Sequence, residues 1–174
     1  MVPEGKHVEQ VYLAPEQGVL SIDCSNKLCI DCSTIDPPTS AKVSSSLRKS
    51  YPTAAFFDAP CSGGTMGATT AKLTFMVGIT ESHPQFSQVK AILSTMGTNI
   101  FACGNPTAGL VTKLSNNYLS GLIAIATAEA MNMAMLHGLD PKTVANVYST
   151  STAGSYINCK VSHSTTFRIA MISP

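Results

Sequence analysis

The stretch that decides the fold is residues 28–58, LCIDCSTIDPPTSAKVSSSLRKSYPTAAFFD. It begins and ends with short apolar runs, residues 28–31 and 54–58, of the kind that form buried strands of a parallel sheet. Between them, Asp36 predicts a helix N-cap, and Pro37 suits the first position of a helix that extends to about Lys49. A strand, a helix and a strand in this order form one crossover unit of an α/β sheet.

Similar patterns predict further elements on both sides of this unit. We expect strands at 73–78 and 99–104, and helices at 8–12, 87–96, 109–138 and 140–148. Residues 59–64 predict a tight loop, residues 65–70 predict a flexible continuation of it, and no further element is predicted after residue 149. The chain is therefore predicted to have an α/β fold with a parallel sheet, followed by one long helix.

Composition limits the classes of partner. The 174 residues are enough for one large core or two small domains, and 11 basic residues against 10 acidic ones give a net charge of +1. Without a basic stripe, we expect no nucleic-acid partner. Charged residues make up only 12% of the chain, against about a quarter in typical domains. This deficit predicts extensive burial, part of it in a subunit interface.

Cysteine usage and hydropathy bear on metals, membranes and compartment. The only C-x-x-C pair has no second pair or histidines at metal-ligand spacing, so we expect reduced thiols and no metal site. Residues 119–136 form an apolar span, but the polar residues within it favour a helix buried in protein over a membrane helix. With no secretion signal at its start, the chain is predicted to be soluble and intracellular. The cysteines are Cys24, Cys29, Cys32, Cys61, Cys103 and Cys159.

Two polar residues near the start of the long helix suggest a site for an acidic substrate. Lys113 and Asn117 stand four residues apart, which places them on one helix face. A buried lysine is costly to desolvate unless an anion meets it. The alternative for an isolated lysine at this position is an ordinary surface charge.

A second candidate is the loop Ser62-Gly63-Gly64. Glycines let backbone N–H groups approach an anion without a Cβ in the way, and the Ser62 hydroxyl adds a donor. Taken alone, this sequence is also that of a simple turn. Asp31 and Asp58, at the ends of the two strands, are expected to cap loops and not to act as chemical bases.

Four sequence segments are more specific together than any one alone. They are DCSTIDP at 31–37, DAPCSGG at 58–64, LTFMVG at 73–78 and G-x-x-x-K-x-x-N-N at 109–117. In this order they closely resemble the β-hydroxyacid dehydrogenase family, which includes 3-hydroxyisobutyrate dehydrogenase. The resemblance covers roughly residues 2–155.

The resemblance implies a Rossmann-type domain, a long interdomain helix and an all-helical domain. On this basis residues 1–106 are a partial NAD(P)-binding domain, and residues 107–174 hold the long helix and part of the helical domain. It also implies hydride transfer between NAD or NADP and a short 3-hydroxy acid. The implied roles are catalysis for Lys113, substrate binding for Ser62, Gly63, Gly64 and Asn117, and cofactor binding for Val2, Pro3 and Thr34.

The sequence departs from the family pattern in ways that leave a second interpretation open. The family's G-x-G-x-x-G cofactor loop is absent, and His7 stands where many relatives have asparagine. We therefore expect a family member truncated at both ends. It is either an NAD(P)-dependent 3-hydroxy acid dehydrogenase or an inactive relative that acts as a binding protein or has no function. Half of a parallel sheet would leave an apolar edge and face uncovered, so we also expect a homo-oligomer, assembled through the long helix. The expected compartment is the cytoplasm or the mitochondrion.

Overall fold

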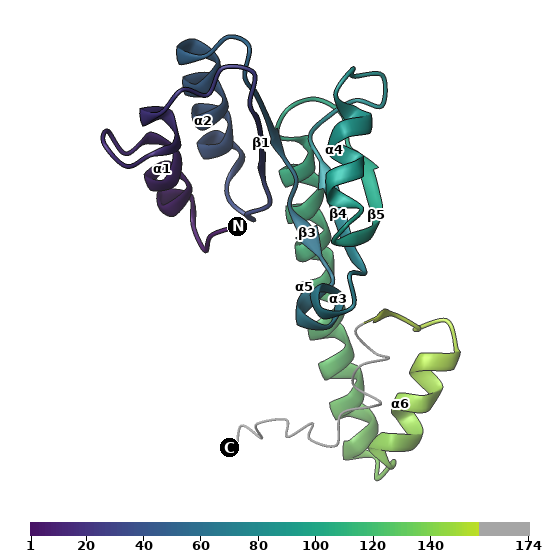
Figure 1. Ribbon diagram of the computed structural model, residues 1–174. Coiled ribbons are helices and arrows are strands. Elements are labelled where there is room, and N and C mark those ends of the chain that lie inside the picture. The colour runs from purple at the N-terminus through teal and green to yellow at the C-terminus, as the bar shows by residue number, and fades with distance from the viewer. Residues whose placement is uncertain (157–174) are drawn as a thin grey trace. The chain divides into compact units, whose positions relative to one another are not determined.

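The computed structural model describes residues 1–156, and the chain divides into two compact units, Met1–Ser115 and Asn116–Pro174. Figure 1 shows the strands and most of the helices in the first unit. The helix α5 (Ala108–Leu136) begins in the first unit and continues into the second.

The strands of the first unit form two small sheets. β1 (Leu28–Asp31) pairs in parallel with β2 (Ala55–Asp58), as the crossover pattern predicts. In the other sheet, β4 (Leu73–Val77) lies between β3 (Cys61–Ser62) and β5 (Gly97–Ala102). The β4–β5 pair is parallel, but the β3–β4 pair is antiparallel, which the prediction of a parallel sheet missed.

Two backbone hydrogen bonds join the two sheets. The N–H of Gly78 donates to Asp58 O at 2.8 Å, and the N–H of Met76 donates to Pro60 O at 3.0 Å. β3 follows β2 after only two residues, so both lie beside β4 along the same line. These bonds therefore fix both the carboxyl end of β2 and the start of β3 against β4.

Helices cover the strands, with a separate hydrophobic cluster on each side. α4 (Phe86–Leu93) contributes Val89 and Leu93 to a cluster with β2 and β4 residues such as Phe57 and Phe75. The second cluster joins Val8 of α1 (Gly5–Leu13), Val43 of α2 (Pro37–Ser50) and Leu110 at the start of α5. The start of α5 is thereby packed against α1 and α2, which lie side by side in Figure 1.

The predicted start of α2 is confirmed. The Asp36 side chain accepts a hydrogen bond from the Thr39 N–H at 2.9 Å, and Pro37 is the first helical residue. This bond satisfies one of the N–H groups that a helix start leaves without a partner. A short 3-10 helix, Val19–Ser21, lies between α1 and β1.

The prediction of a tight loop at residues 59–64 is only partly right, and the prediction of a flexible stretch at 65–70 is wrong. Residues 59–70 contain β3 and the six-residue helix α3 (Gly64–Thr69). The two glycines and two threonines of α3 have low helix propensity, so the sequence showed no helical pattern here. The hydroxyls of Thr69 and Thr70 donate to the carbonyls four residues earlier, which supplies local bonds that hydrophobic periodicity does not reveal.

The prediction that the long helix is buried is also wrong for the described part of the chain. Along α5, Tyr118 is 73% exposed and Leu136 is 78% exposed. By length and composition α5 is apolar enough to cross a membrane. Only 11% of its apolar 18-residue stretch is buried within the structure. An apolar helix usually finds a covering surface, but residues 1–156 of one chain do not supply it.

In the second unit, α5 continues to Leu136 and α6 (Pro141–Thr150) follows. Gly138 has a φ of 80°, the left-handed conformation predicted for the residue that ends the long helix. Asp140 then caps α6 by accepting the Thr143 N–H at 3.0 Å. A small cluster of Met131, Val144 and Ala145 packs the two helices together.

Candidate functional site

The side chain of Asp58, at the end of β2, holds the start of α5. It is only 3% exposed, and its two carboxylate oxygens accept the N–H groups of Thr107 at 2.8 Å and Leu110 at 2.9 Å. Burial raises the pKa of Asp58, while hydrogen bonds from these N–H groups oppose the rise. The expected loop-capping role is confirmed, and it extends to a helix that begins about 50 residues later.

Two glycines make this close approach possible. A Cβ on Gly78 would overlap the Asp58 carboxylate, and a Cβ on Gly109 would overlap the Met76 carbonyl oxygen. The strand end, the turn after β4 and the first turn of α5 are thus in backbone contact. Lys113 is carried on the next turn of α5, so this junction fixes its position in the first unit.

Lys113 is buried in the described structure, as the substrate-site hypothesis required. Its side chain is 8% exposed, and no hydrogen bond or ion pair to it is found within residues 1–156. Burial lowers the pKa of the Lys113 ammonium, and the neighbouring Cys61 sulfur partly opposes this shift. A buried ammonium without a carboxylate partner is well suited to meet an anionic or developing negative charge.

Cys61 connects Lys113 to the predicted anion loop. Burial raises the pKa of the Cys61 thiol, and the positive charge of Lys113 lowers it, so the ammonium lies within electrostatic range of the thiol. Cys61 directly precedes Ser62-Gly63-Gly64. The predicted catalytic lysine therefore acts electrostatically on the residue that begins the predicted substrate loop.

The backbone of the loop has the conformation that its glycines permit. Cys61 and Ser62 pair with Phe75 and Thr74 of β4, which fixes the entry to the loop. Gly63 and Gly64 then have φ values of 135° and 62°. Both are left-handed conformations that favour glycine, so the reversal after Ser62 explains the glycine pair.

The residues predicted to contact the cofactor gather at the carboxyl end of β1. The Val2 N–H donates to Ser33 Oγ at 2.9 Å, which places Val2 and Pro3 beside Ser33 and its neighbour Thr34. In α1, the Nδ1 atom of His7 is buried without a hydrogen-bond partner among the described residues. The carboxyl ends of parallel strands are where open α/β sheets bind their ligands.

The role of Asn117 stays a prediction. It follows Lys113 by four residues on α5, and its side chain is exposed. It belongs to the second compact unit, whereas Lys113 and the loop belong to the first.

Sequence reasoning missed Cys61 as a neighbour of Lys113. The two residues are far apart in the chain, and no periodicity links them. The available signal was that Cys61 lies next to the glycine loop, which the family resemblance already paired with the lysine.

Two family models match the chain. The model described as the NAD binding domain of 6-phosphogluconate dehydrogenase matches residues 1–104. The model described as the NAD-binding domain of NADP-dependent 3-hydroxyisobutyrate dehydrogenase matches residues 107–170. Together they account for most of the sequence, and they meet at the beginning of α5.

Curated relatives and solved structures agree with these models. A probable mitochondrial 3-hydroxyisobutyrate dehydrogenase of Dictyostelium discoideum is 42% identical over 88% of this chain and 46% of its own length. An NAD-dependent L-serine dehydrogenase of Pseudomonas aeruginosa is 37% identical over 90% of this chain and 51% of its own length. A Mycobacterium tuberculosis 3-hydroxyisobutyrate dehydrogenase structure with L-serine aligns at a TM-score of 0.77 and 32% identity, covering 91% of this chain and 51% of that one.

The chain spans about half the length of the curated relatives that it matches. Over that half, the structure aligns with a solved 3-hydroxyisobutyrate dehydrogenase, as the sequence resemblance predicted. The family models and the identity to several dehydrogenases support the same assignment. This chain belongs to the β-hydroxyacid dehydrogenase family, the family of 3-hydroxyisobutyrate dehydrogenase.

Proposed function

We propose that this chain acts in the NAD(P)-dependent oxidation of a short 3-hydroxy acid, with Lys113 as the general acid/base. The single observation that carries the proposal is the burial of Lys113, without a carboxylate partner in the described structure, beside the residue that begins the Ser62-Gly63-Gly64 loop. An anion bound by the loop would supply the negatively charged partner that the Lys113 ammonium lacks.

Oxidation of an alcohol carbon releases a hydride and a proton. NAD or NADP, held by the residues at the end of β1, would supply the hydride acceptor. The hydroxyl proton goes to neutral Lys113 Nζ as the carbonyl forms, and in the reverse direction the ammonium returns it. Burial lowers the pKa of Lys113, which raises the fraction of neutral amine near working pH. A group poised in this way typically contributes a rate factor of about 10²–10⁴.

The names of the relatives indicate the substrate class. The compounds in those names, 3-hydroxyisobutyrate and L-serine, both carry a carboxylate and a hydroxyl on the third carbon. We propose that the backbone of Gly63 and Gly64 and the Ser62 hydroxyl bind the carboxylate, with Asn117 as a further ligand. This arrangement would set the hydroxyl of the substrate toward Lys113.

The residues at the end of β1 fit a nucleotide cofactor. Val2, Pro3 and Thr34 are proposed to contact it. The buried Nδ1 of His7 lacks a partner among residues 1–156, so it can accept or donate a hydrogen bond there. We propose either NAD or NADP as the cofactor, since dehydrogenases named for each are among the matches.

A cofactor titration tests the proposal. Purified chain is titrated with NADH and with NADPH while nicotinamide fluorescence is followed. Saturable binding is expected, and turnover of 3-hydroxyisobutyrate or L-serine with NAD or NADP should then be measurable. Lys113→Ala should lower kcat about 10²–10⁴-fold and leave cofactor affinity nearly unchanged.

Lys72→Ala is the matched control, since Lys72 is an exposed lysine that follows α3. Turnover by Lys113→Ala equal to that of the unaltered chain would remove Lys113 from the mechanism. No saturable binding up to millimolar cofactor would refute the enzyme proposal for this chain. The second candidate, an inactive relative that binds other molecules, would then stand, in line with the half-length match.

Assembly, domain division and compartment are further parts of the proposal. Exposed apolar side chains along α5, among them Tyr118, Leu119, Leu122 and Ile125, support a homo-oligomer formed through this helix. Residues 1–106 and 107–174 are proposed as the partial cofactor domain and the helical part. The mitochondrial names of the Dictyostelium and rat relatives support an intracellular location, mitochondrial or cytoplasmic. Sedimentation of the chain with and without Leu122→Lys tests the interface.

A further inference from the structure

A pocket of about 280 Å³ lies between α2, β2 and the turns that follow β4 and β5. None of its lining residues belongs to the Cys61–Gly64 loop or is Lys113. Its walls include the amino end of β2, whereas the candidate substrate loop follows the carboxyl end of that strand. The pocket is thus a separate hollow within the first unit.

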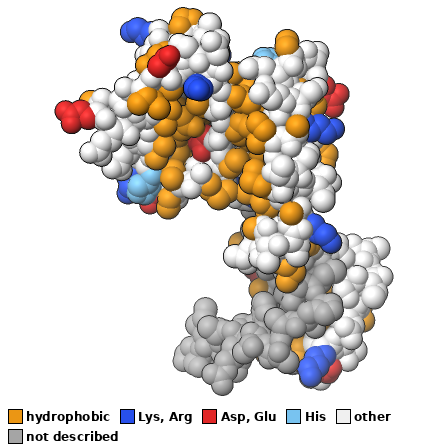
Figure 2. Space-filling view, viewed as in Figure 1, with side chains coloured by type: hydrophobic (Ala, Val, Ile, Leu, Met, Phe, Trp, Pro, Cys, Tyr) orange, Lys and Arg blue, Asp and Glu red, His pale blue; other side chains and the backbone are white. Residues whose placement is uncertain are grey.

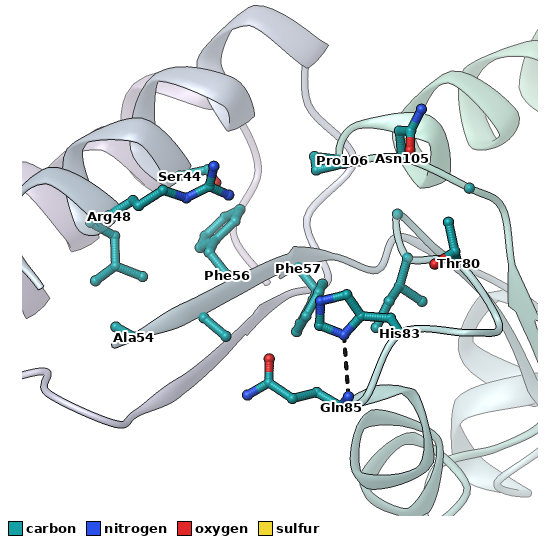
Figure 3. A pocket seen from close by; sticks show the side chains of 15 residues that line it. Ser44, Arg48, Ala54, Phe56, Phe57, Thr80, His83, Gln85, Asn105 and Pro106 are labelled. Carbon is teal, nitrogen blue, oxygen red and sulfur yellow. Dashed lines mark hydrogen bonds between the residues drawn. The ribbon is translucent and has the colours of Figure 1, made fainter. Parts of the chain in front are cut away.

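Hydrogen-bond donors stand on two sides of this pocket. In Figure 3, Arg48 and Ser44 from α2 lie on one side, and His83, Thr80 and Asn105 lie on the other. The Arg48 guanidinium forms no hydrogen bond or ion pair in the described part of the chain. Its charge is therefore available to a ligand.

His83 adds a donor of defined orientation. Its Nδ1 accepts the N–H of Gln85 at 3.2 Å, so the neutral ring carries its proton on Nε2. The ring also packs edge-on against Phe57, with the ring centroids 5.3 Å apart. These two contacts fix the imidazole, which in Figure 3 lies beside Phe57, across the pocket from Arg48.

The remaining wall is apolar, and no acidic side chain of residues 1–156 lines the pocket. Phe56, Phe57, Leu47 and Ile79 form its apolar surface. A smaller adjoining hollow of about 140 Å³ shares Arg48, Ser44 and Phe56, but it also contains Asp58. The Asp58 carboxylate disfavours an anion in the smaller hollow, so an anionic ligand belongs in the larger one.

We propose that this pocket binds a small organic anion with a flat apolar body, such as an aromatic carboxylate. The carboxylate would meet Arg48 and the His83 Nε2–H, and the ring would lie against Phe56 and Ile79. Pockets for drug-sized ligands start at about 300 Å³, so this volume suits a single ring with one charged group. Charge-assisted hydrogen bonds to a guanidinium are roughly twice as strong as neutral ones, which sets the preference for an anion.

Nuclear magnetic resonance of the full 174-residue chain tests the proposal. Nitrogen-15-labelled chain is titrated with benzoate and, separately, with benzamide, a neutral molecule of nearly the same shape. Benzoate should shift the amide signals of Thr80, His83 and Asn105 saturably, with a Kd on the order of 1 mM. Benzamide should bind at least about tenfold more weakly, since it lacks the charge.

Arg48→Gln should weaken benzoate binding about tenfold, the effect of losing one charge-assisted pair. Lys49→Gln is the matched control, because Lys49 is the next residue of α2, carries the same charge and does not line the pocket. Equal binding of benzoate and benzamide, or equal loss in both variants, would overturn the proposal. Shifts confined to Ser62, Gly63 and Lys113 would also overturn it, and would place the anion at the candidate substrate site.

Discussion

Replacement of Asp58 is the perturbation with the largest expected effect on stability. The carboxylate is buried and accepts two backbone N–H groups, from Thr107 at 2.8 Å and Leu110 at 2.9 Å. Asp58→Ala removes both acceptors and leaves a void. Asp58→Asn keeps one acceptor oxygen and places an NH₂ group against the second N–H.

The magnitude follows from these contacts. A hydrogen bond to a charged group contributes about 1.5–3 kcal/mol, so Asp58→Ala should lower the free energy of unfolding by about 3–6 kcal/mol. Asp58→Asn loses one such bond but avoids burying a charge, and we expect a loss of about 1–2 kcal/mol. Typical domains have only about 5–15 kcal/mol in total.

Urea unfolding followed by circular dichroism measures both variants, with equal m-values as the test that the folded state is comparable. Asp36→Ala is the matched control, since Asp36 is an exposed cap with a single N–H partner and should cost about 1 kcal/mol. Because burial raises the pKa of Asp58, the wild-type chain should gain stability relative to Asp58→Asn as pH falls from the folded pKa toward about 4. A loss for Asp58→Ala no larger than that for Asp36→Ala would refute the reasoning.

Three further predictions concern other parts of the first unit and α5. Since burial lowers the pKa of Lys113, Lys113→Met should be more stable than wild type at pH 7, and the difference should shrink as pH rises toward about 10.4; urea unfolding at several pH values measures it. Gly109→Ala should cost about 1–3 kcal/mol through overlap with the Met76 carbonyl, whereas Gly121→Ala, with open space around it, should stabilise α5 by up to about 1 kcal/mol; thermal unfolding that ranks them the other way contradicts the close packing. Lys113→Ala should slow alkylation of Cys61 by iodoacetamide at pH 8 severalfold, measured by mass spectrometry against Cys103 in the same sample, because the ammonium lowers the pKa of that thiol.

The parts of the fold that the sequence predicted well depend on local signals. Residues 28–31 and 55–58 are strands because short apolar runs flanked by polar residues are a local pattern. The start of α2 follows from Asp36 and Pro37 alone. Boundaries were less accurate: α4 ends at Leu93, and the strand predicted at 99–104 spans 97–102.

The features that the sequence failed to predict depend either on contacts between distant residues or on a covering surface that the described chain does not supply. α3 has little apolar periodicity, so the glycine-rich sequence predicted a loop. The exposure of α5 was missed because an apolar composition shows that a helix needs a covering surface but does not show which chain supplies it. For the site, the family resemblance suggested Lys113 and the loop, which stay predictions, and the structure adds an electrostatic influence between Cys61 and the lysine.

The hydrogen bond from the Thr107 N–H to Asp58 spans 49 residues of chain, and that span contains β3, α3, β4, α4 and β5. Closing so long a loop costs entropy that is recovered only when the enclosed strands have already paired. The hydrogen bond between Asp58 and Thr107 should therefore form late, after the transition state of folding. Its loss would then mainly accelerate unfolding and leave the refolding rate nearly constant, so this carboxylate controls how long the native state persists.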